Sequence, residues 1–148
     1  MRSLTLPAAV LALALALPAN AAAPAVRQID LVERATTDTI SLHGGTAADN
    51  VGDVATFTNE IFDAANVTKV GSNQGICVRM VVGKALECHL TLMLADGQIM
   101  VAGPVLDGVD SALAIVGGTG AYVGARGEML IHARDAKASA YDFHYRLM

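Results

Sequence analysis

The chain has 148 residues, of which 53% are hydrophobic, 16% charged and only 4% aromatic. This length allows one domain with a substantial core, because a domain of about 150 residues buries roughly 70% of its unfolded surface. Ten basic against fourteen acidic residues give a formal charge of −4. A mildly acidic chain lacks the basic patches typical of nucleic-acid-binding proteins, so we expect no nucleic-acid partner. Scattered Gly and Pro exclude a collagen-like chain.

The N-terminus has the three-part pattern of a secretory signal peptide. Arg2 is positive, an unbroken apolar run follows over residues 8–17, and Ala19-Asn20-Ala21 is a small-x-small cleavage site. The run is too short for a transmembrane helix, which needs about 20 residues. The alternative is a retained N-terminal anchor. We predict a signal peptide at residues 1–21, one domain at residues 22–148, no membrane span, and a secreted or periplasmic protein.

Short β-type runs separated by turn residues fill the remaining chain. Strands are expected at residues 26–34, 51–58, 75–82, 85–94, 98–102, 112–116, 127–134 and 139–147. The connections include a polar loop at residues 43–50, a turn or short helical piece at residues 63–69, and an Asp96-Gly97 hairpin turn. Seven or eight short strands with no long helical period predict an all-β barrel or sandwich.

Export affects the interpretation of Cys77 and Cys88, because cysteines tend to pair in oxidising compartments. A hairpin with its turn at residues 82–83 places residue 77 opposite residue 88 and residue 81 opposite residue 84. A disulfide between the two cysteines is then geometrically possible. The alternative is two reduced thiols, which a one-residue shift of register would separate. Neither cysteine has a His or a second Cys at ligand spacing, so we expect no metal site.

Alternation shows which faces of two strands are apolar. One face of the last strand carries Tyr141, Phe143, Tyr145 and Leu147. In residues 85–94 the even positions form an apolar face of Leu86, Cys88, Leu90, Leu92 and Leu94, and the hairpin register adds Cys77 and Arg79 to it. The other face of residues 75–82, with Ile76, Val78 and Met80, is also apolar, which predicts a second burial surface such as a subunit contact.

Four sequence strings resemble one superfamily, in order along the chain. Residues 51–59 (VGDVATFTN), 70–77 (VGSNQGIC) and 97–104 (GQIMVAGP) resemble successive stretches of allene oxide cyclases. Residues 115–127 (IVGGTGAYVGARG) are similar to the GGTG-x-[FY]-x-x-ARG motif of dirigent proteins, which share that fold. The resemblance implies an eight-stranded antiparallel β-barrel that is commonly a trimer.

The resemblance also implies a function. Allene oxide cyclases close a fatty-acid epoxide into a cyclopentenone in an apolar lumen, and dirigent proteins guide phenolic radicals or quinone methides to one stereochemical outcome. Both hold a reactive molecule in one conformer, which removes competing pathways. The expected function is therefore binding of an apolar small molecule and direction of its cyclisation or isomerisation, as an isomerase-like protein without a cofactor.

Carry-over from the resemblance indicates the catalytic candidates. The pocket cysteine of the cyclases falls on Cys77, and the Glu-x-Asn pair of their first strand falls on Asp30 and Val32. At the first position Asp30 retains an acidic side chain, whereas at the second Val32 lacks the amide that the cyclases have there. We expect Asp30 to face the lumen, where burial would raise its pKa and make it a proton donor near neutral pH. The alternative is an Asp on the wet face or paired with an arginine.

Further candidates are expected to bind the ligand. Arg79 is a partner of Asp30, an anchor for a carboxylate ligand or a rim residue, and Leu90 and Leu92 line the lumen together with Val32. The glycines at residues 117–120 lack the Lys-Ser/Thr of a phosphate loop and are expected to form a turn.

Two other functions fit the same pattern. One is a non-catalytic carrier of a hydrophobic ligand, and the other is a structural barrel whose lumen is filled with Leu. The volume of the lumen separates them, because a ligand site offers ~300 Å³ or more.

Overall fold

The computed structural model describes residues 26–44 and 49–148, and every regular element in this part of the chain is a β-strand. The predicted signal peptide at residues 1–21 lies outside the described residues. The strands are β1 Arg27–Arg34, β2 Thr39–Ser41, β3 Val54–Asp63, β4 Lys69–Val81, β5 Ala85–Leu94, β6 Gly97–Leu106, β7 Ser111–Gly120, β8 Gly127–Ala133 and β9 Ala140–Leu147.

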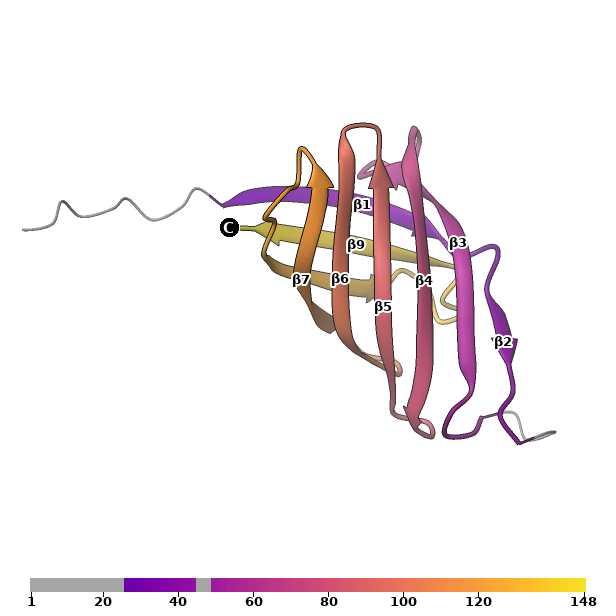
Figure 1. Cartoon of the computed structure of the whole chain (residues 1–148). Helices are drawn as coiled ribbons and strands as arrows, with labels where there is room; N and C mark the ends of the chain where they lie inside the picture. The colour runs from indigo at the N-terminus through magenta and orange to yellow at the C-terminus, as the bar shows by residue number, and fades with distance from the viewer. Residues whose placement is uncertain (1–25, 45–48) are drawn as a thin grey trace, which may run out of the picture.

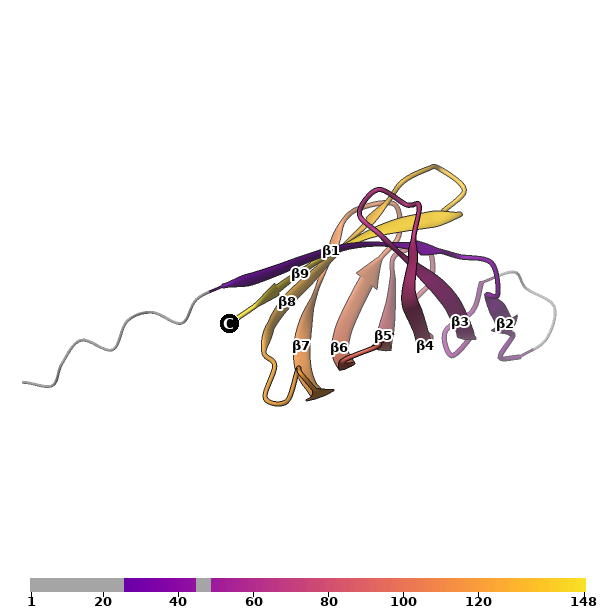
Figure 2. The same ribbon diagram turned by 90° about the horizontal axis from the view of Figure 1, so that it is seen from above.

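Eight of these strands close into an antiparallel barrel, which confirms the predicted fold class. Strands β3 to β9 pair in chain order, β9 pairs with β1, and β1 pairs with β3. Strands β3 to β7 form the front of the barrel in Figure 1, and β1 and β9 cross behind them at a steep angle; Figure 2 shows the barrel from above. Closure pairs β1 on both sides, so no long unpaired edge is left in the barrel.

The short strand β2 is an addition that the sequence pattern did not indicate. It pairs with the first residues of β3, and its side chains are exposed. Three residues with exposed side chains carry no alternation of burial, which is why the pattern missed them. Strand β2 lies at one end of the barrel, which we call the mouth: the end at which β4 finishes and β5 begins.

Besides β7, three strands are longer than the alternation indicated. Strand β3 extends to Asp63, β4 begins at Lys69, and β6 continues through Pro104 to Leu106. Glycine, proline and polar residues weaken the strand pattern in these stretches, but long neighbouring strands pair with their backbone and keep it extended.

The glycine-rich stretch at residues 117–120 forms the end of β7 and not a turn. Gly118 is required by close packing, because a Cβ atom there would collide with the carbonyl oxygens of Tyr122 and Gln98. The turn follows at residues 121–126.

A disulfide joins Cys77 to Cys88 across the β4–β5 hairpin. The predicted register is confirmed here, since Cys77 lies opposite Cys88 and Arg79 opposite Leu86. Nearer the turn the prediction is wrong, because a register shift after Arg79 pairs Val81 with Ala85. Such a bulge inserts one extra residue in one strand and leaves the pairing on either side intact.

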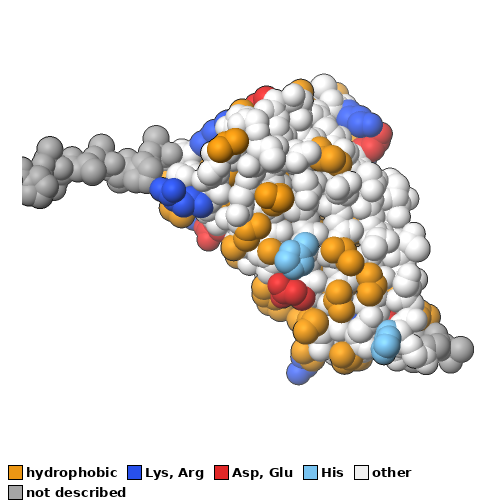
Figure 3. Space-filling model, viewed as in Figure 1, with side chains coloured by type: hydrophobic (Ala, Val, Ile, Leu, Met, Phe, Trp, Pro, Cys, Tyr) orange, Lys and Arg blue, Asp and Glu red, His pale blue; other side chains and the backbone are white. Residues whose placement is uncertain are grey.

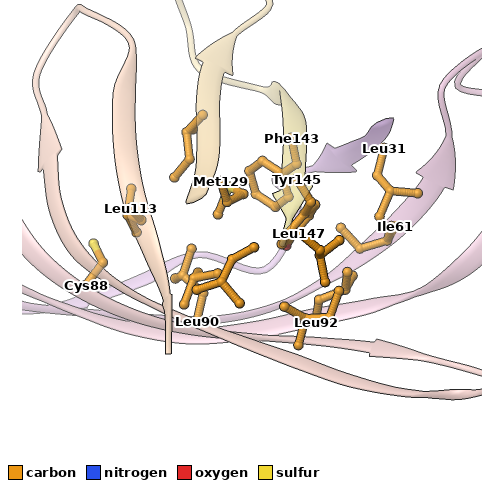
Figure 4. Packing of buried hydrophobic residues seen from close by; sticks show 14 of the residues in the cluster. Leu31, Ile61, Cys88, Leu90, Leu92, Leu113, Met129, Phe143, Tyr145 and Leu147 are labelled. Carbon is orange, nitrogen blue, oxygen red and sulfur yellow. The ribbon is translucent and has the colours of Figure 1, made fainter. Parts of the chain in front are cut away.

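The core fills the end of the barrel opposite the mouth. Figure 4 shows buried side chains from the two sides of the barrel converging on its axis. The side chains that pack this far end are at most 1% exposed and include Ile61, Leu92, Ile99, Met129 and Tyr145. These buried, mainly apolar side chains fill this end of the lumen.

Loss of the disulfide is expected to lower stability without changing the fold. Replacing both Cys77 and Cys88 by Ala frees a short loop, with a sequence separation of 11 residues, in the unfolded chain. The free energy of unfolding should fall by about 2–3 kcal/mol in urea titrations.

Reductant provides the control for this experiment. It should destabilise the wild type by a similar amount and leave the double variant unchanged. Equal stability of the wild type with and without reductant, at complete reduction by mass spectrometry, would contradict the expectation.

Candidate functional site

The phase of β1 decides which acid reaches the lumen. Ile29 and Leu31 pack with the core, and Glu33, on the same face, is only 3% exposed. Asp30 lies on the outer surface, where its side chain is 42% exposed and a carboxylate oxygen is 2.8 Å from Nδ1 of His144. The expectation that Asp30 faces the lumen is therefore wrong, because the odd positions of β1 point inward.

Val32 is buried but does not face the lumen either. It lies opposite Phe62 in the β1–β3 pairing, and neither residue belongs to the core cluster. The guanidinium of Arg34 lies 3.6 Å from the centre of the Phe62 ring. Val32 is thus covered on the outside of the barrel, which argues against its predicted place in a ligand-binding lumen.

A cavity of about 150 Å³ occupies the interior at the mouth. Its walls are mainly apolar and aromatic, and two acids, Glu33 and Asp38, interrupt them. The remaining lining residues are Ala55, Phe57, Cys77, Leu86, Cys88, Leu90, Val105, Ile131, Tyr141 and Phe143. A wider hollow of about 390 Å³ adjoins the cavity, since Val105, Ile131 and Tyr141 line both.

The structure brings only some of the predicted site residues to this cavity. Leu90 and Cys77 line it, whereas Leu92 is fully buried in the packed far end. The sulfur of Cys77 is bonded to that of Cys88, so Cys77 offers an apolar disulfide wall and no free thiol.

Arg79 stands at the rim with its charge already paired. Its Nε lies 2.7 Å from Asp49, and its terminal nitrogen lies 2.9 Å from Asp107. These contacts tie the loop before β3 and the loop after β6 to the end of β4. Arg79 was expected to be a partner of Asp30, an anchor for a carboxylate ligand or a rim residue. The structure fits the rim residue, because two carboxylates already pair with the guanidinium that an anionic ligand would need.

Four polar residues that sequence reasoning missed form a network beside the cavity. The amide of Asn73 donates to a carboxyl oxygen of Glu33 at 2.9 Å, and the amide of Asn59 donates to Asp38 at 2.8 Å. Asn59 and Asn73 are direct partners on β3 and β4. Asn59 ends the string at residues 51–59 and alternates in phase with Phe57, and Asn73 lies in the string at residues 70–77 in phase with Cys77. This period-two spacing could have placed both amides on the inner face.

Asn59 also fixes the segment that follows β1. Its side-chain oxygen accepts hydrogen bonds from the backbone N–H groups of Thr36 and Thr37, both at 3.0 Å. This segment carries Asp38 to the cavity wall. One buried amide therefore positions the second acid.

Burial raises the pKa of Glu33 to about 7. Desolvation is the largest cause, the nearby charge of Asp38 acts in the same direction, and hydrogen bonds from Asn73 and Asn59 oppose it. A carboxyl group with such a pKa populates both its acid and its carboxylate form at neutral pH, which general acid–base chemistry requires.

The fold and the site together describe a closed eight-stranded antiparallel β-barrel with an acid-containing cavity at one end. Residues 30–142 match the family model described as the allene oxide cyclase barrel like domain. The chain belongs to this family.

Solved structures of other proteins share the fold. Pyocyanin demethylase superposes with a TM-score of 0.72 at 22% identity, over 82% of this chain and 100% of the other. A pterocarpan synthase dirigent protein gives 0.66 at 17% identity, over 83% and 93% of the two chains. AbnU, an exo-specific intermolecular Diels-Alderase, gives 0.63 at 18% identity, over 84% and 98%. At these identities the likeness concerns the fold alone.

The described residues show neither a metal-binding cluster nor a helix that could span a membrane. Residues 26–44 and 49–148 contain no group of three or more His, Cys, Asp or Glu side chains arranged to hold a metal ion. The same residues include no helix that is long and apolar enough to cross a membrane.

Substitution of Glu33 by Gln is expected to remove a pH dependence of stability. The raised pKa means that the folded protein keeps a proton that the unfolded chain loses above its ordinary pKa of 4.5. Wild-type stability should therefore fall as the pH rises from 4.5 through about 7, by up to about 3 kcal/mol, and stay low above that. Urea titrations at pH 5 and pH 8 measure the difference.

Glu128→Gln is the matched control, because Glu128 is an exposed carboxylate on β8. It should keep the wild-type pH dependence. A Glu33→Gln variant whose stability falls as steeply as that of the wild type between pH 5 and pH 8 would rule out Glu33 as the source.

Proposed function

We propose that the protein binds a small apolar molecule in the mouth cavity and directs its isomerisation or cyclisation, with Glu33 moving the proton. The observation that carries this proposal is a carboxyl group with a pKa near 7 in the wall of an apolar cavity. Family membership supports it, because structural neighbours include a cyclising Diels-Alderase and a pterocarpan synthase dirigent protein.

The chemistry follows from the two forms of Glu33. The acid donates a proton to an oxygen or nitrogen atom of the bound molecule, and the carboxylate accepts one from another atom, so that a bond shifts or a ring closes with no net loss of atoms. The surrounding walls hold one conformer and exclude water, which favours one product. Asn73 orients the Glu33 carboxyl through its 2.9 Å hydrogen bond.

The volume of the cavity sets the size of the molecule. At about 150 Å³ it is smaller than the ~300 Å³ expected of a ligand site, so the volume of this cavity taken alone favours the filled structural barrel. A cavity of this volume accepts a single ring the size of benzene, and a two-ring molecule reaches into the adjoining hollow. The packed far end excludes a long chain lying along the barrel axis.

A purely structural barrel explains the packed far end but not Glu33. A carboxyl group in an apolar interior costs several kcal/mol unless it is neutralised or well paired. The carboxyl group of Glu33 accepts a hydrogen bond of 2.9 Å from the amide of Asn73, and a second acid, Asp38, lies nearby. That arrangement is costly for a scaffold and useful for proton transfer.

Export is a further part of the proposal. The signal-peptide pattern at residues 1–21 and the Cys77–Cys88 disulfide both support a secreted or periplasmic location, since disulfides persist in oxidising compartments.

Self-association through the front of the barrel completes the proposal. Figure 3 shows hydrophobic side chains gathered on the face of β4 to β7. Exposed members of this apolar front are Ile76, Met80, Met100, Leu106 and Val116. A soluble protein covers such a surface by contact with a partner, and the family resemblance indicates a homotrimer.

The proposed reaction predicts proton exchange on a small ketone. The wild type should accelerate exchange of the α-hydrogens of 2-indanone for deuterium, followed by NMR. Glu33→Gln should lower the rate by ~100-fold, because general acid–base groups contribute 10²–10⁴-fold. Ala55→Leu fills the cavity and should abolish the acceleration.

The controls are Glu128→Gln and Ala65→Leu, the latter in the exposed turn after β3. Both should keep the wild-type rate. Full activity of Glu33→Gln would exclude Glu33 as the proton carrier. Absence of exchange, together with native mass spectra showing no small molecule bound to protein from its own host, would refute the function.

The apolar front predicts a change of oligomeric state. Val116→Lys places a charge on the β7 side of the proposed contact and should convert the oligomer to a monomer in light-scattering measurements. Val123→Lys, at an exposed position in the turn after β7, should leave the oligomer intact. A monomeric wild type would contradict the prediction.

A further inference from the structure

The charges around the mouth cavity point to the class of its ligand. We propose that the cavity takes a ring-containing molecule with a nitrogen that is, or becomes, positively charged, such as an amidine, an aromatic amine or a nitrogen heterocycle, and that it rejects carboxylates. This inference rests on the proposed function and narrows its substrate.

Acids are the only charged side chains on the wall of the cavity. Glu33 and Asp38 line it, and no Lys, Arg or His is among the described residues that do. The nearest cationic residue on β4, Arg79, is engaged by Asp49 and Asp107 at the rim. The wall therefore presents negative charge that no protein cation compensates within the cavity.

The groups that face Glu33 from neighbouring elements add no positive charge to this negatively charged wall. They are Asp38 from the segment after β1, Asn59 and Asn73 from β3 and β4, and Tyr145 from β9. The two amides donate one hydrogen bond each to the acids, and none of the four brings a positive charge.

Tyr141 from β9 lies where the cavity meets the wider hollow, and the negative charges around it affect its pKa. Burial raises the pKa of Tyr141, and the negative charges of Asp38, Glu33 and Asp135 raise it further. Asp110 and Asp135 line the hollow, where the one imidazole among its described lining residues, His132, lies 2.7 Å from Asp110. A ligand approaching the cavity through this hollow passes acids first.

The apolar walls suit the rest of such a ligand. Phe57, Tyr141 and Phe143 line the cavity, and aromatic rings attract cations over their faces. A ring with one cationic nitrogen fits the volume, pairs with Glu33 or Asp38, and recovers the cost of burying the acid. A carboxylate would add a negative charge to two acids in a poorly hydrated space.

The pairing also links binding to protons. A bound cation favours the carboxylate form of Glu33, so binding below neutral pH releases the proton that Glu33 holds. Affinity for a permanent cation should therefore rise as the pH increases through about 7. A neutral ligand of the same shape should show no such rise. A basic neutral ligand instead takes the proton from Glu33, which gives the same ion pair.

Three probes of one shape and different charge test the inference. They are benzamidine, a cation, benzamide, a neutral molecule, and benzoate, an anion, titrated at pH 6 and pH 8 by calorimetry with NMR mapping to Phe143 and Tyr141. Benzamidine should bind roughly tenfold more tightly than benzamide at pH 8, by the strength of a charge-assisted hydrogen bond. Its affinity should be lower at pH 6, and benzoate should bind weakest.

Variants assign the effect to the cavity acids. Glu33→Gln should remove the preference for benzamidine over benzamide and the pH dependence of benzamidine binding, and Asp38→Asn should reduce the preference. Glu128→Gln, on the outer surface, should alter neither. Thermal unfolding of each variant checks that it is folded.

The outcomes separate this inference from the function beneath it. Equal binding of the three probes in the cavity, or a preference that survives Glu33→Gln, would overturn the charge inference and leave the cavity as a ligand site. No binding of any probe would overturn both.

Discussion

A carboxyl group held in hydrocarbon is the constraint on which this structure depends. Glu33 lies on the inward face of β1 because Ile29 and Leu31, in the same phase, pack into the core. The protein does not neutralise this acid with a cation but gives it an amide donor from Asn73 and leaves its pKa near 7. Stability is sacrificed at neutral pH, where the carboxylate form of Glu33 is partly populated, and a proton is kept available beside a cavity.

The two ends of the barrel differ in how they are filled. At the far end Leu92, Met129 and Tyr145 are completely buried, and this burial stabilises the fold. The mouth is less completely filled, and its polar network is costly. Around it, the Cys77–Cys88 disulfide and the Arg79 ion pairs hold the strand ends and loops together. A rigid rim keeps a small cavity at a fixed shape, which is what steering one conformer requires.

In the inference drawn above, the acidic surroundings of the cavity give it a preference for a cationic ligand. A fold does not by itself fix the ligand, which depends on the side chains of the site. In this chain Arg79 is withdrawn from the lumen by Asp49 and Asp107, and the acids of the cavity stand without a basic partner among the described lining residues. In the proposed function, both acids select the ligand and Glu33 also transfers the proton.

The sequence by itself determined the all-β barrel, the facing of Cys77 and Cys88, and the apolar faces of β5 and β9, because strong alternation and four successive motifs leave little choice. For β1 the carry-over was misleading. Ile29 and Leu31 alternate with Gln28 and Asp30 and favour the phase that turns Glu33 inward, but the carried-over pair placed Asp30 and Val32 at the lumen. Only the tertiary structure brought Glu33 beside Asn73 and Asp38, because these residues lie on segments far apart in the sequence that meet when β1 pairs with β9 and β3 and the barrel closes.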